Sequence, residues 1–491
     1  MKIATVILSL TFACQLQAAE SRPPNVVLFL ADDLGWRDTT VSGSTFYETP
    51  NIERLARRGM KFTNAYAASP LCSPTRASIL TGQYPGRLRL TTPACHLPQV
   101  VLDPRLPATG PPTRKALTPQ TRTRLPNRYL TVAEMLKTAG YRTGFFGKWH
   151  LGHAPYLPEN QGFDVVVGGR HHPGPPRSYF SPWPIDTIPQ PSKGEHITDR
   201  LAKEAVEFIR DNKQQPFLLC FWDYSVHAPF EAKQELIEKY RGKAAPDNPQ
   251  RNPVMGAMIE PLDDAVGALL DTLDSLRLAK DTIIILFSDN GGNMYNTVEG
   301  LPPTNNRPLR NGKGSIYEGG VRVPMIVVWP GEVSSSTTSE AVVSSVDLYP
   351  TILEMVGLRP RADQVLDGLS IAGVLRRQSG VSDRPVFCHF PHYVKATGNL
   401  PSTSARLGDW KLIRFYADTA RQTDRFELYN LANDIGEANN LAPRMPEKVR
   451  ELNALIERHL RDTRSLVPIP NPAYDSNAKR PDFGRAKNGR K

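Results

Sequence analysis

Continuous apolar runs that end at polar or ionisable residues constrain the fold of this chain more than any other feature. The clearest runs are residues 25–31, 217–222 and 282–287. Runs of this length are typical of strands that are buried on both faces of a parallel sheet. We expect two further strands, at residues 143–146 and 325–329.

Segments with helical signals alternate with these strands. A Thr-Val-Ala-Glu capping box, for example, opens one of them at Thr131. The expected helices cover residues 51–58, 74–80, 131–139, 198–212, 254–276 and 346–356. This alternation predicts an α/β fold in which helices flank a large, doubly wound mixed sheet.

The pattern changes after about residue 385. Residues 406–416 and 426–430 resemble antiparallel strands, and a helix is expected at 446–462. We therefore predict a large α/β domain at 20–385 and a smaller α+β domain at 386–465, which combines an antiparallel sheet with a helix. The remaining residues, 466–491, have little to bury and are expected to form a basic, partly disordered tail.

The N-terminus has the pattern of an export signal. Lys2 precedes an apolar run at 3–13, and small residues suited to cleavage follow it. We predict a signal peptide at residues 1–19 and an exported protein that is periplasmic or secreted. The run is too short to span a bilayer, and no later segment is long and apolar enough, so no transmembrane segment is expected.

Positive charge is concentrated in two segments of the chain. The formal net charge is +11, of which the segment 88–128 carries +6 and the segment 479–491 carries +5. Both segments would attract a polyanion, but no recognition motif accompanies them, so we expect no nucleic-acid partner. The first overlaps a stretch with eight prolines at 93–126, which we interpret as a long insertion or lid-like loop.

Hard oxygen ligands follow two of the predicted strands. Asp32 and Asp33 come directly after the first strand, and Asp289 and Asn290 follow the strand at 282–287. In open α/β sheets, ligands bind at such carboxyl ends of strands. Carboxylate and amide oxygens suit calcium or magnesium, and histidine-rich zinc ligand sets are missing from these positions. The residues predict a site for one hard divalent cation.

The string from Leu71 to Gly82 reads Leu-Cys-Ser-Pro-Thr-Arg-Ala-Ser-Ile-Leu-Thr-Gly. It resembles the signature of the sulfatase family, in which the cysteine is oxidised to formylglycine. Taken alone, Cys72 is also compatible with a buried cysteine before a helix that starts with proline. Five further segments resemble motifs of the family. They are Ala-Asp-Asp-Leu-Gly at 31–35, Gly-Lys-Trp-His-Leu-Gly at 147–152, His-Ala-Pro at 227–229, Ser-Asp-Asn-Gly-Gly at 288–292 and Gly-Lys-Gly at 312–314. The resemblance covers residues 24–442.

The resemblance implies a calcium-binding, formylglycine-dependent sulfatase of the alkaline phosphatase superfamily, with 20–385 as its catalytic domain. It implies one calcium ion held by Asp32, Asp33, Asp289, Asn290 and an oxygen of converted Cys72. It implies that Arg76 and Lys148 hold the formylglycine and the sulfate, and that His150 binds or deprotonates the formylglycine hydrate. It implies that His227 and Lys313 lie on the side of the leaving group. A formylglycine-generating enzyme would act on the chain during maturation.

The sequence leaves the substrate open. A sulfated carbohydrate or an aryl sulfate is expected. Candidates for the rim of the pocket are His171, His172, Trp183 and residues 389–393, each of which is equally compatible with packing or a surface loop. One alternative is a phosphomonoester or phosphonate-ester hydrolase of the same superfamily. Another is a non-catalytic protein that binds sulfated polysaccharide through its basic segments.

Overall fold

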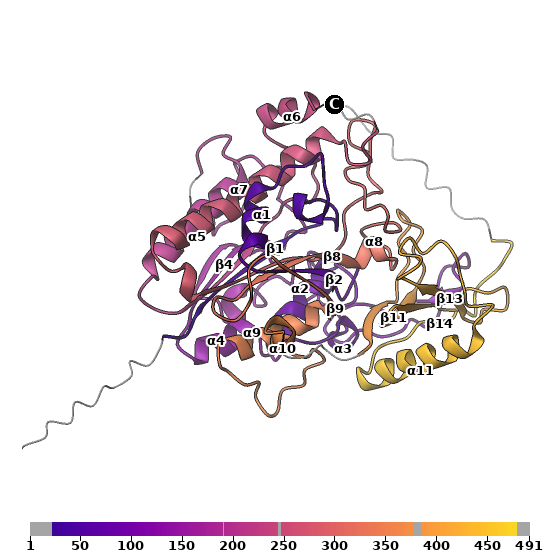
Figure 1. Ribbon diagram of the computed structural model, residues 1–491. Coiled ribbons are helices and arrows are strands. Elements are labelled where there is room, and N and C mark those ends of the chain that lie inside the picture. The colour runs from indigo at the N-terminus through magenta and orange to yellow at the C-terminus, as the bar shows by residue number, and fades with distance from the viewer. Residues whose placement is uncertain (1–21, 190, 244–246, 378–383, 479–491) are drawn as a thin grey trace, which may run out of the picture.

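A single large sheet forms the centre of the protein (Figure 1). The computed structural model describes residues 22–189, 191–243, 247–377 and 384–478, so the predicted signal peptide at 1–19 lies outside the described residues. The eight strands lie in the order β5 (Val165–Gly168), β4 (Arg142–Gly147), β6 (Phe217–Trp222), β1 (Asn25–Ala31), β7 (Thr282–Ser288), β8 (Arg322–Val328), β2 (Met60–Tyr66) and β9 (Thr337–Ser344).

The sheet is mixed, as predicted. Neighbouring strands from β5 to β7 are parallel, whereas β8 is antiparallel to both of its neighbours. Since β2 is antiparallel to β8, it points in the same direction as β7. The carboxyl ends of β4, β6, β1, β7 and β2 therefore meet at one edge of the sheet.

Helices cover both faces of the sheet, and the side chains of each central strand divide between the two resulting cores. In β1, Val27 and Phe29 join one core, whereas Val26 and Leu28 join the other, because successive side chains point to opposite faces. The first core packs against α1 (Pro50–Arg57), α5 (Ile197–Asp211), α6 (Gln234–Arg241) and α7 (Pro253–Ser275). The second packs against α2 (Cys72–Thr81), α3 (Pro85–Leu88), α4 (Val132–Thr138), α9 (Leu348–Met355) and α10 (Ala372–Leu375).

Short elements complete this part of the chain. They are α8 (Glu318–Val321) and the 3-10 helices Thr40–Ser42, Pro158–Gln161, Ala279–Asp281 and Ser345–Asp347. The capping box predicted at Thr131 is confirmed, since its hydroxyl accepts from the Glu134 amide and the Glu134 carboxylate accepts from the Thr131 amide. Among the helices of the described residues, none has both the length and the apolar character needed to cross a bilayer. The four cysteines among the described residues, Cys72, Cys95, Cys220 and Cys388, are free and buried.

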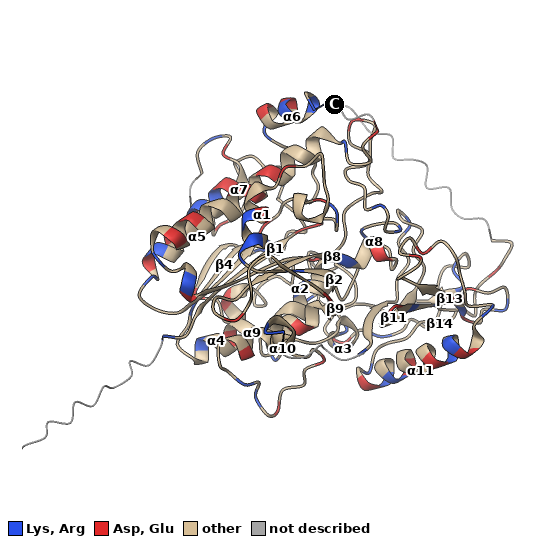
Figure 2. Ribbon diagram, viewed as in Figure 1, with Lys and Arg blue, Asp and Glu red and all other residues tan. Residues whose placement is uncertain are grey.

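A smaller antiparallel sheet lies beside the large one. Its strands, in spatial order, are β10 (Val386–Phe390), β11 (Ser402–Leu407), β12 (Trp410–Phe415) and β13 (Arg425–Asn430). One face packs against α11 (Pro446–Asp462) through Leu412, Leu428 and Ile456, and the other packs against the main body through residues such as Tyr66 and Ile413. Helices α5 and α11 carry both signs of charge along their length, whereas the central strands are largely uncharged (Figure 2).

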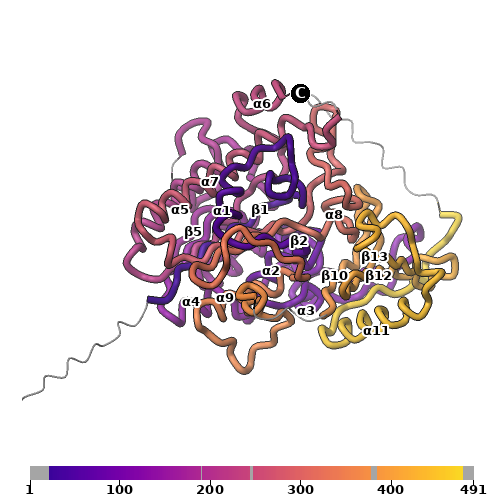
Figure 3. Tube along the Cα trace, viewed as in Figure 1, coloured from indigo at the N-terminus to yellow at the C-terminus, as the bar shows by residue number. Residues whose placement is uncertain are grey.

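The first part of the expected tail differs from the prediction of disorder. Strand β14 (Ile469–Pro470) pairs with β3 (Ala116–Leu117) of the basic insertion, and Figure 3 shows this purple segment beside the yellow C-terminal part. Asn471 is fully buried and donates hydrogen bonds to the carbonyl groups of Pro111 and Arg114. Backbone pairing and one buried amide thus fix a segment that has few apolar residues. Residues 479–491 lie outside the described part of the chain.

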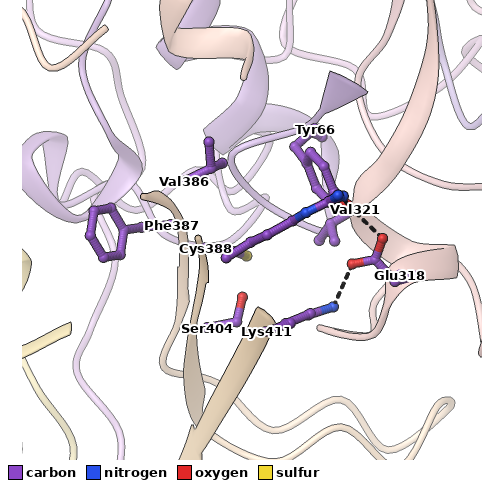
Figure 4. Close-up of a pocket in the computed structure, with 10 residues that line it drawn as sticks. Tyr66, Glu318, Val321, Val386, Phe387, Cys388, Ser404 and Lys411 are labelled. Carbon is purple, nitrogen blue, oxygen red and sulfur yellow. Dashed lines mark hydrogen bonds and ion pairs between the residues drawn. The ribbon is translucent and has the colours of Figure 1, made fainter. Parts of the chain in front are cut away.

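A buried charged cluster joins the two sheets (Figure 4). The Lys411 ammonium lies 2.9 Å from a carboxylate oxygen of Glu318 and 2.9 Å from one of Glu437. Glu318 also accepts a hydrogen bond from the Tyr66 hydroxyl at 2.6 Å. Burial favours the neutral form of Glu318, but the charges of Lys411, Arg322 and Arg406 outweigh it and lower the pKa of Glu318 to about 2. Glu318 and Lys411 therefore form a buried ion pair, whereas burial raises the pKa of the second carboxylate, Glu437, to about 7.

Replacing Lys411 with methionine is expected to lower the free energy of unfolding by about 3–5 kcal/mol, because the buried Glu318 carboxylate would lose the cation that it contacts. Chemical denaturation followed by circular dichroism measures the change. The matched control is Lys448→Met, which removes the partly buried surface partner of Glu451 and should change stability by about 0.5 kcal/mol or less. Equal stability of the two variants would show that the cluster does not hold the sheets together.

Candidate active site

The carboxyl edge of the large sheet gathers the ionisable residues that the sequence singled out. Asp32 and Asp33 follow β1, and Asp289 follows β7. Lys148 comes directly after β4, and His227 lies in the loop after β6. Cys72 is the first residue of α2, which follows β2, and Lys313 lies in the loop before α8. Parallel strand direction thus brings together side chains that are as much as 280 residues apart in the sequence.

Three carboxylates and one amide form the floor of the site, and all four are almost completely buried. The Asp33 amide donates to Asp289 Oδ1 at 3.2 Å, and Asn290 Nδ2 donates to Asp33 Oδ1 at 2.8 Å. Burial and the neighbouring charge of Asp32 raise the pKa of Asp289 to about 6. The carboxylates therefore repel one another and require positive charge nearby.

Three basic side chains contact these carboxylates. Lys148 Nζ donates to Asp32 Oδ2 at 2.5 Å, and Lys313 Nζ donates to Asp33 Oδ2 at 2.6 Å. Arg76 Nε donates to Asp289 Oδ2 at 2.8 Å, and its guanidinium also lies 3.7 Å from Asp32 Oδ1. Burial disfavours the charge on Lys313, but the Asp33 carboxylate outweighs it and raises the pKa of Lys313 well above its usual value. Despite burial, Asp289 and Asp32 likewise raise the pKa of Arg76, so Arg76 and Lys313 both remain cationic at neutral pH.

The oxygen atoms of these four side chains are suitable ligands for a divalent cation. Asp32 Oδ1 and Asn290 Oδ1 are buried, yet neither accepts a hydrogen bond from any described residue. A buried acceptor without a partner costs about 1–3 kcal/mol, which a bound cation would offset. One ligand atom from each of Asp32, Asp33, Cys72 and His227 lies within 4.8 Å of the others. Three of these four belong to the predicted ligand set, and His227 was expected on the leaving-group side.

Cys72 is buried at the N-terminus of α2, with 2% of its surface exposed. Burial raises the pKa of its thiol to about 12, even though Lys148 and Lys313 act in the opposite direction. The thiolate, which is the nucleophilic form of cysteine, is therefore scarce at neutral pH. The unmodified side chain is poorly suited to act as a thiol nucleophile.

Two histidines flank the cluster. His227 Nδ1 donates to the Ala228 carbonyl oxygen at 2.7 Å, which leaves Nε2 pointing to Asp33 Oδ2 at 3.9 Å. Burial, together with the charges of Lys313 and Lys148, lowers the pKa of His227 to about 3. His150 is buried, and its carbonyl oxygen accepts from the Ser73 hydroxyl at 2.6 Å. Burial and Lys148 lower the pKa of His150 well below its usual value.

Comparison with known protein families identifies the family of the chain. The family model described as Sulfatase matches residues 24–358, and the model described as N-sulphoglucosamine sulphohydrolase, C-terminal, matches residues 311–465. The chain belongs to the sulfatase family. It is a sulfuric ester hydrolase with the large mixed sheet and the smaller antiparallel sheet of sulfatase structures.

Relatives and solved structures agree with this assignment. The sulfatase is 35% identical to the N-acetylgalactosamine-6-sulfatase of Rattus norvegicus over 80% of its own length and 73% of the relative. It is 31% identical to the arylsulfatase A of Homo sapiens, covering 91% and 90% of the two chains. Among solved structures, Ps i-CgsB in complex with k-i-k-neocarrahexaose is 27% identical, with a TM-score of 0.73 and coverage of 90% and 94%.

Of the rim residues considered from the sequence, Trp183 and residues 389–393 lie in packed surroundings. Trp183 belongs to the core beneath one face of the sheet. His389 Nδ1 is 2.7 Å from the Thr403 hydroxyl, and His392 Nε2 is 2.8 Å from the Thr91 hydroxyl. The His392 contact ties the basic segment 88–128 to the smaller domain of the sulfatase, whereas the His389 contact lies within the smaller sheet.

His171 and His172 lie in a row of imidazoles at the edge of the site. The rings of His171 and His153 stack with centroids 3.8 Å apart, and those of His171 and His172 are 4.3 Å apart. The loop at residues 170–174, which carries His171 and His172, contacts both His150 and His227 of the sulfatase site. At one end, the His150 amide donates to the Arg170 carbonyl oxygen, and at the other, Gly174 packs against the His227 ring.

Sequence reasoning missed one residue that contacts the site of this sulfatase. His96, from the basic insertion, places its Nδ1 3.0 Å from Nε2 of His150. The insertion has no periodicity that would predict which of its side chains points inward. The only available signal was a histidine within a proline-rich segment that follows the Cys72 motif closely in sequence.

Proposed function

We propose that this sulfatase removes sulfate from a sulfated carbohydrate, using formylglycine made from Cys72 and one bound calcium ion. The observation that carries the proposal is the convergence of Cys72, three carboxylates and three cations at one edge of the sheet. The carbohydrate substrate is supported by the relatives, which include an N-acetylgalactosamine-6-sulfatase and a structure in complex with neocarrahexaose.

The first element of the proposal is the calcium site. Asp32, Asp33, Asp289 and Asn290 would hold calcium together with an oxygen of converted Cys72, because all five supply hard oxygen ligands. A bound calcium ion supplies positive charge for the sulfuryl oxygens. The three carboxylates are already balanced by three cationic side chains, so a divalent ion would leave the site positive and attract an anionic ester.

The nucleophile is the second element of the proposal. A formylglycine hydrate at position 72 supplies the oxygen for attack on sulfur. Arg76 and Lys148 orient this group and the sulfate, since both are fixed by buried contacts to Asp289 and Asp32. Positively charged groups that are preorganised in this way commonly supply the largest part of the rate enhancement.

Proton transfer is the third element. Lys313 stays protonated, so it can contact the sulfate and donate to the departing oxygen. His227 is neutral in the free protein, but an anionic substrate beside Nε2 would raise its pKa and allow it to share this role. His150 is assigned to binding or deprotonating the formylglycine hydrate.

Replacing Lys313 with methionine is expected to lower kcat about 100- to 1000-fold, since one preorganised charge would be lost from the transition state. Release of sulfate from an aryl sulfate measures the effect. The matched control is Lys280→Met, at an exposed lysine after α7, and it should retain the wild-type rate. A wild-type kcat in Lys313→Met would remove Lys313 from the site.

A screen of defined sulfated saccharides, read as released sulfate, tests the proposed substrate. We expect turnover of at least one sulfated sugar and much slower release of phosphate from aryl phosphate. A phosphonate monoester hydrolase of Agrobacterium radiobacter shares the fold with a TM-score of 0.64, but at 19% identity the likeness shows the fold alone. Faster hydrolysis of the phosphate ester than of the sulfate ester would contradict the proposal.

Maturation and export belong to the same proposal. A formylglycine-generating enzyme would act on Cys72, and cleavage near residue 19 would release the exported chain. The mature protein is then expected to begin close to residue 20, which N-terminal sequencing of the exported form can establish.

A further inference from the structure

We propose that His96 is a positioning residue that fixes which ring nitrogen of His150 carries the proton. The inference rests on the role of His150 under the proposed function. It adds His96 to the site, although His96 lies outside all of the segments that resemble family motifs. It also gives the basic insertion a function in catalysis that is separate from its charge.

The two imidazoles are in direct contact. His96 Nδ1 lies 3.0 Å from His150 Nε2, with the ring planes inclined by 41°. The other ring nitrogen of His150, Nδ1, is buried and has no hydrogen-bond partner among the described residues. One nitrogen of His150 is thus committed to His96, and we assign the other to the formylglycine hydrate of the proposed function.

A single hydrogen connects the two rings, so their tautomers are coupled. Burial lowers the pKa of His96 and of His150, and the charge of Lys148 acts in the same direction on both. Both rings are therefore neutral. If His150 Nε2–H donates to His96, then His150 Nδ1 carries a lone pair. If His96 Nδ1–H donates instead, then His150 Nδ1 carries a hydrogen.

The proposal selects the first arrangement. With His96 Nδ1 as acceptor, His150 can take a proton at Nδ1 from a hydroxyl group in the site. The ring becomes an imidazolium, and its Nε2–H keeps the bond to His96, which stabilises the new positive charge. No other proton has to move, and the proton returns from Nδ1 at the end of the cycle.

Hydrogen bonds within and around the insertion fix the backbone at His96. The Arg124 guanidinium is buried and donates to the carbonyl oxygens of Cys95, Leu97 and Pro98, on either side of His96. His153 Nε2 lies 3.1 Å from the carbonyl oxygen of His96 itself. Several contacts therefore fix the backbone at His96, as expected for a residue that orients a catalytic partner.

A matched pair of substitutions isolates the hydrogen bond. His96→Asn keeps an oxygen that can accept from His150 Nε2–H, whereas His96→Leu has a similar size but no acceptor. We expect kcat on an aryl sulfate to fall about 10- to 100-fold in His96→Leu, with little change in KM, and to be largely restored in His96→Asn. Equal kcat values in the wild type and His96→Leu would overturn the proposal.

Nitrogen-15 NMR of histidine-labelled protein tests the tautomer without any turnover. The His150 signals are assigned by their loss in His150→Gln. We expect protonated Nε2 and unprotonated Nδ1 in the wild type and in His96→Asn, and a mixture of tautomers in His96→Leu. A wild-type His150 that is protonated at Nδ1 would overturn the proposal. Failure to hydrolyse any sulfated sugar would instead contradict the proposed substrate and leave the NMR result standing.

Discussion

Cys72→Ala is expected to abolish turnover, with a loss of at least about 10⁴-fold in kcat, as is typical when a nucleophile is removed. The methyl group cannot be converted to an aldehyde, so no oxygen is available at position 72. Release of sulfate from an aryl sulfate gives the rate. The fold should survive, because the change removes one buried sulfur atom, and the thermal unfolding midpoint serves as the check.

Cys72→Ser provides a sharper comparison. Serine offers one oxygen that can attack sulfur, but it lacks the second oxygen needed to release the sulfate. We expect at most one equivalent of phenol per enzyme and no continued turnover, provided that mass spectrometry shows unmodified serine. Sustained turnover by a verified Cys72→Ser or Cys72→Ala protein would show that formylglycine is not the nucleophile.

Removal of the divalent cation is expected to have the second-largest effect. Loss of about 4 kcal/mol of transition-state stabilisation corresponds to roughly a 1000-fold lower kcat. Dialysis against a calcium chelator should produce this loss, and added calcium should reverse it. Activity that survives exhaustive chelation, with no metal detected by elemental analysis, would contradict the assignment of a cation to this site.

Asp33→Asn locates the cation without relying on activity. The change keeps the size of the side chain but removes a charge that contacts Lys313 and Asn290. Calorimetric titration with calcium should show much weaker binding than in the wild type. The matched control is Asp271→Asn, at an exposed carboxylate of α7, which should leave calcium binding unchanged. Equal binding by Asp33→Asn and the wild type would place the ion elsewhere.

Much of the fold was predictable because buried strands and amphipathic helices leave strong periodic patterns. The strand predicted at 25–31 is β1, and the strand predicted at 282–287 is β7, one residue longer. The helix predicted at 254–276 is α7 to within one residue at each end. Placement of Asp32 and Asp289 at one edge followed from these strands alone, since parallel neighbours end on the same side.

Other parts of the fold and of the site could not be predicted, because they depend on contacts between residues that are far apart in the sequence. The edge strand β9 (Thr337–Ser344) is half exposed and mostly polar at its start, and β2 alternates irregularly around a break in register, so neither has the signal of a buried strand. The ordering of residues 466–478 depends on pairing with β3, more than 300 residues earlier. His96 likewise reaches His150 only through the fold of the insertion.

Mass spectrometry of the peptide that contains Cys72, combined with an aldehyde-reactive hydrazide label, tests the central claim most directly. The account predicts that in active protein this peptide has oxygen in place of sulfur, has lost two hydrogens, and takes up the label. An intact thiol at Cys72 in a preparation that hydrolyses sulfate esters at full rate would contradict it.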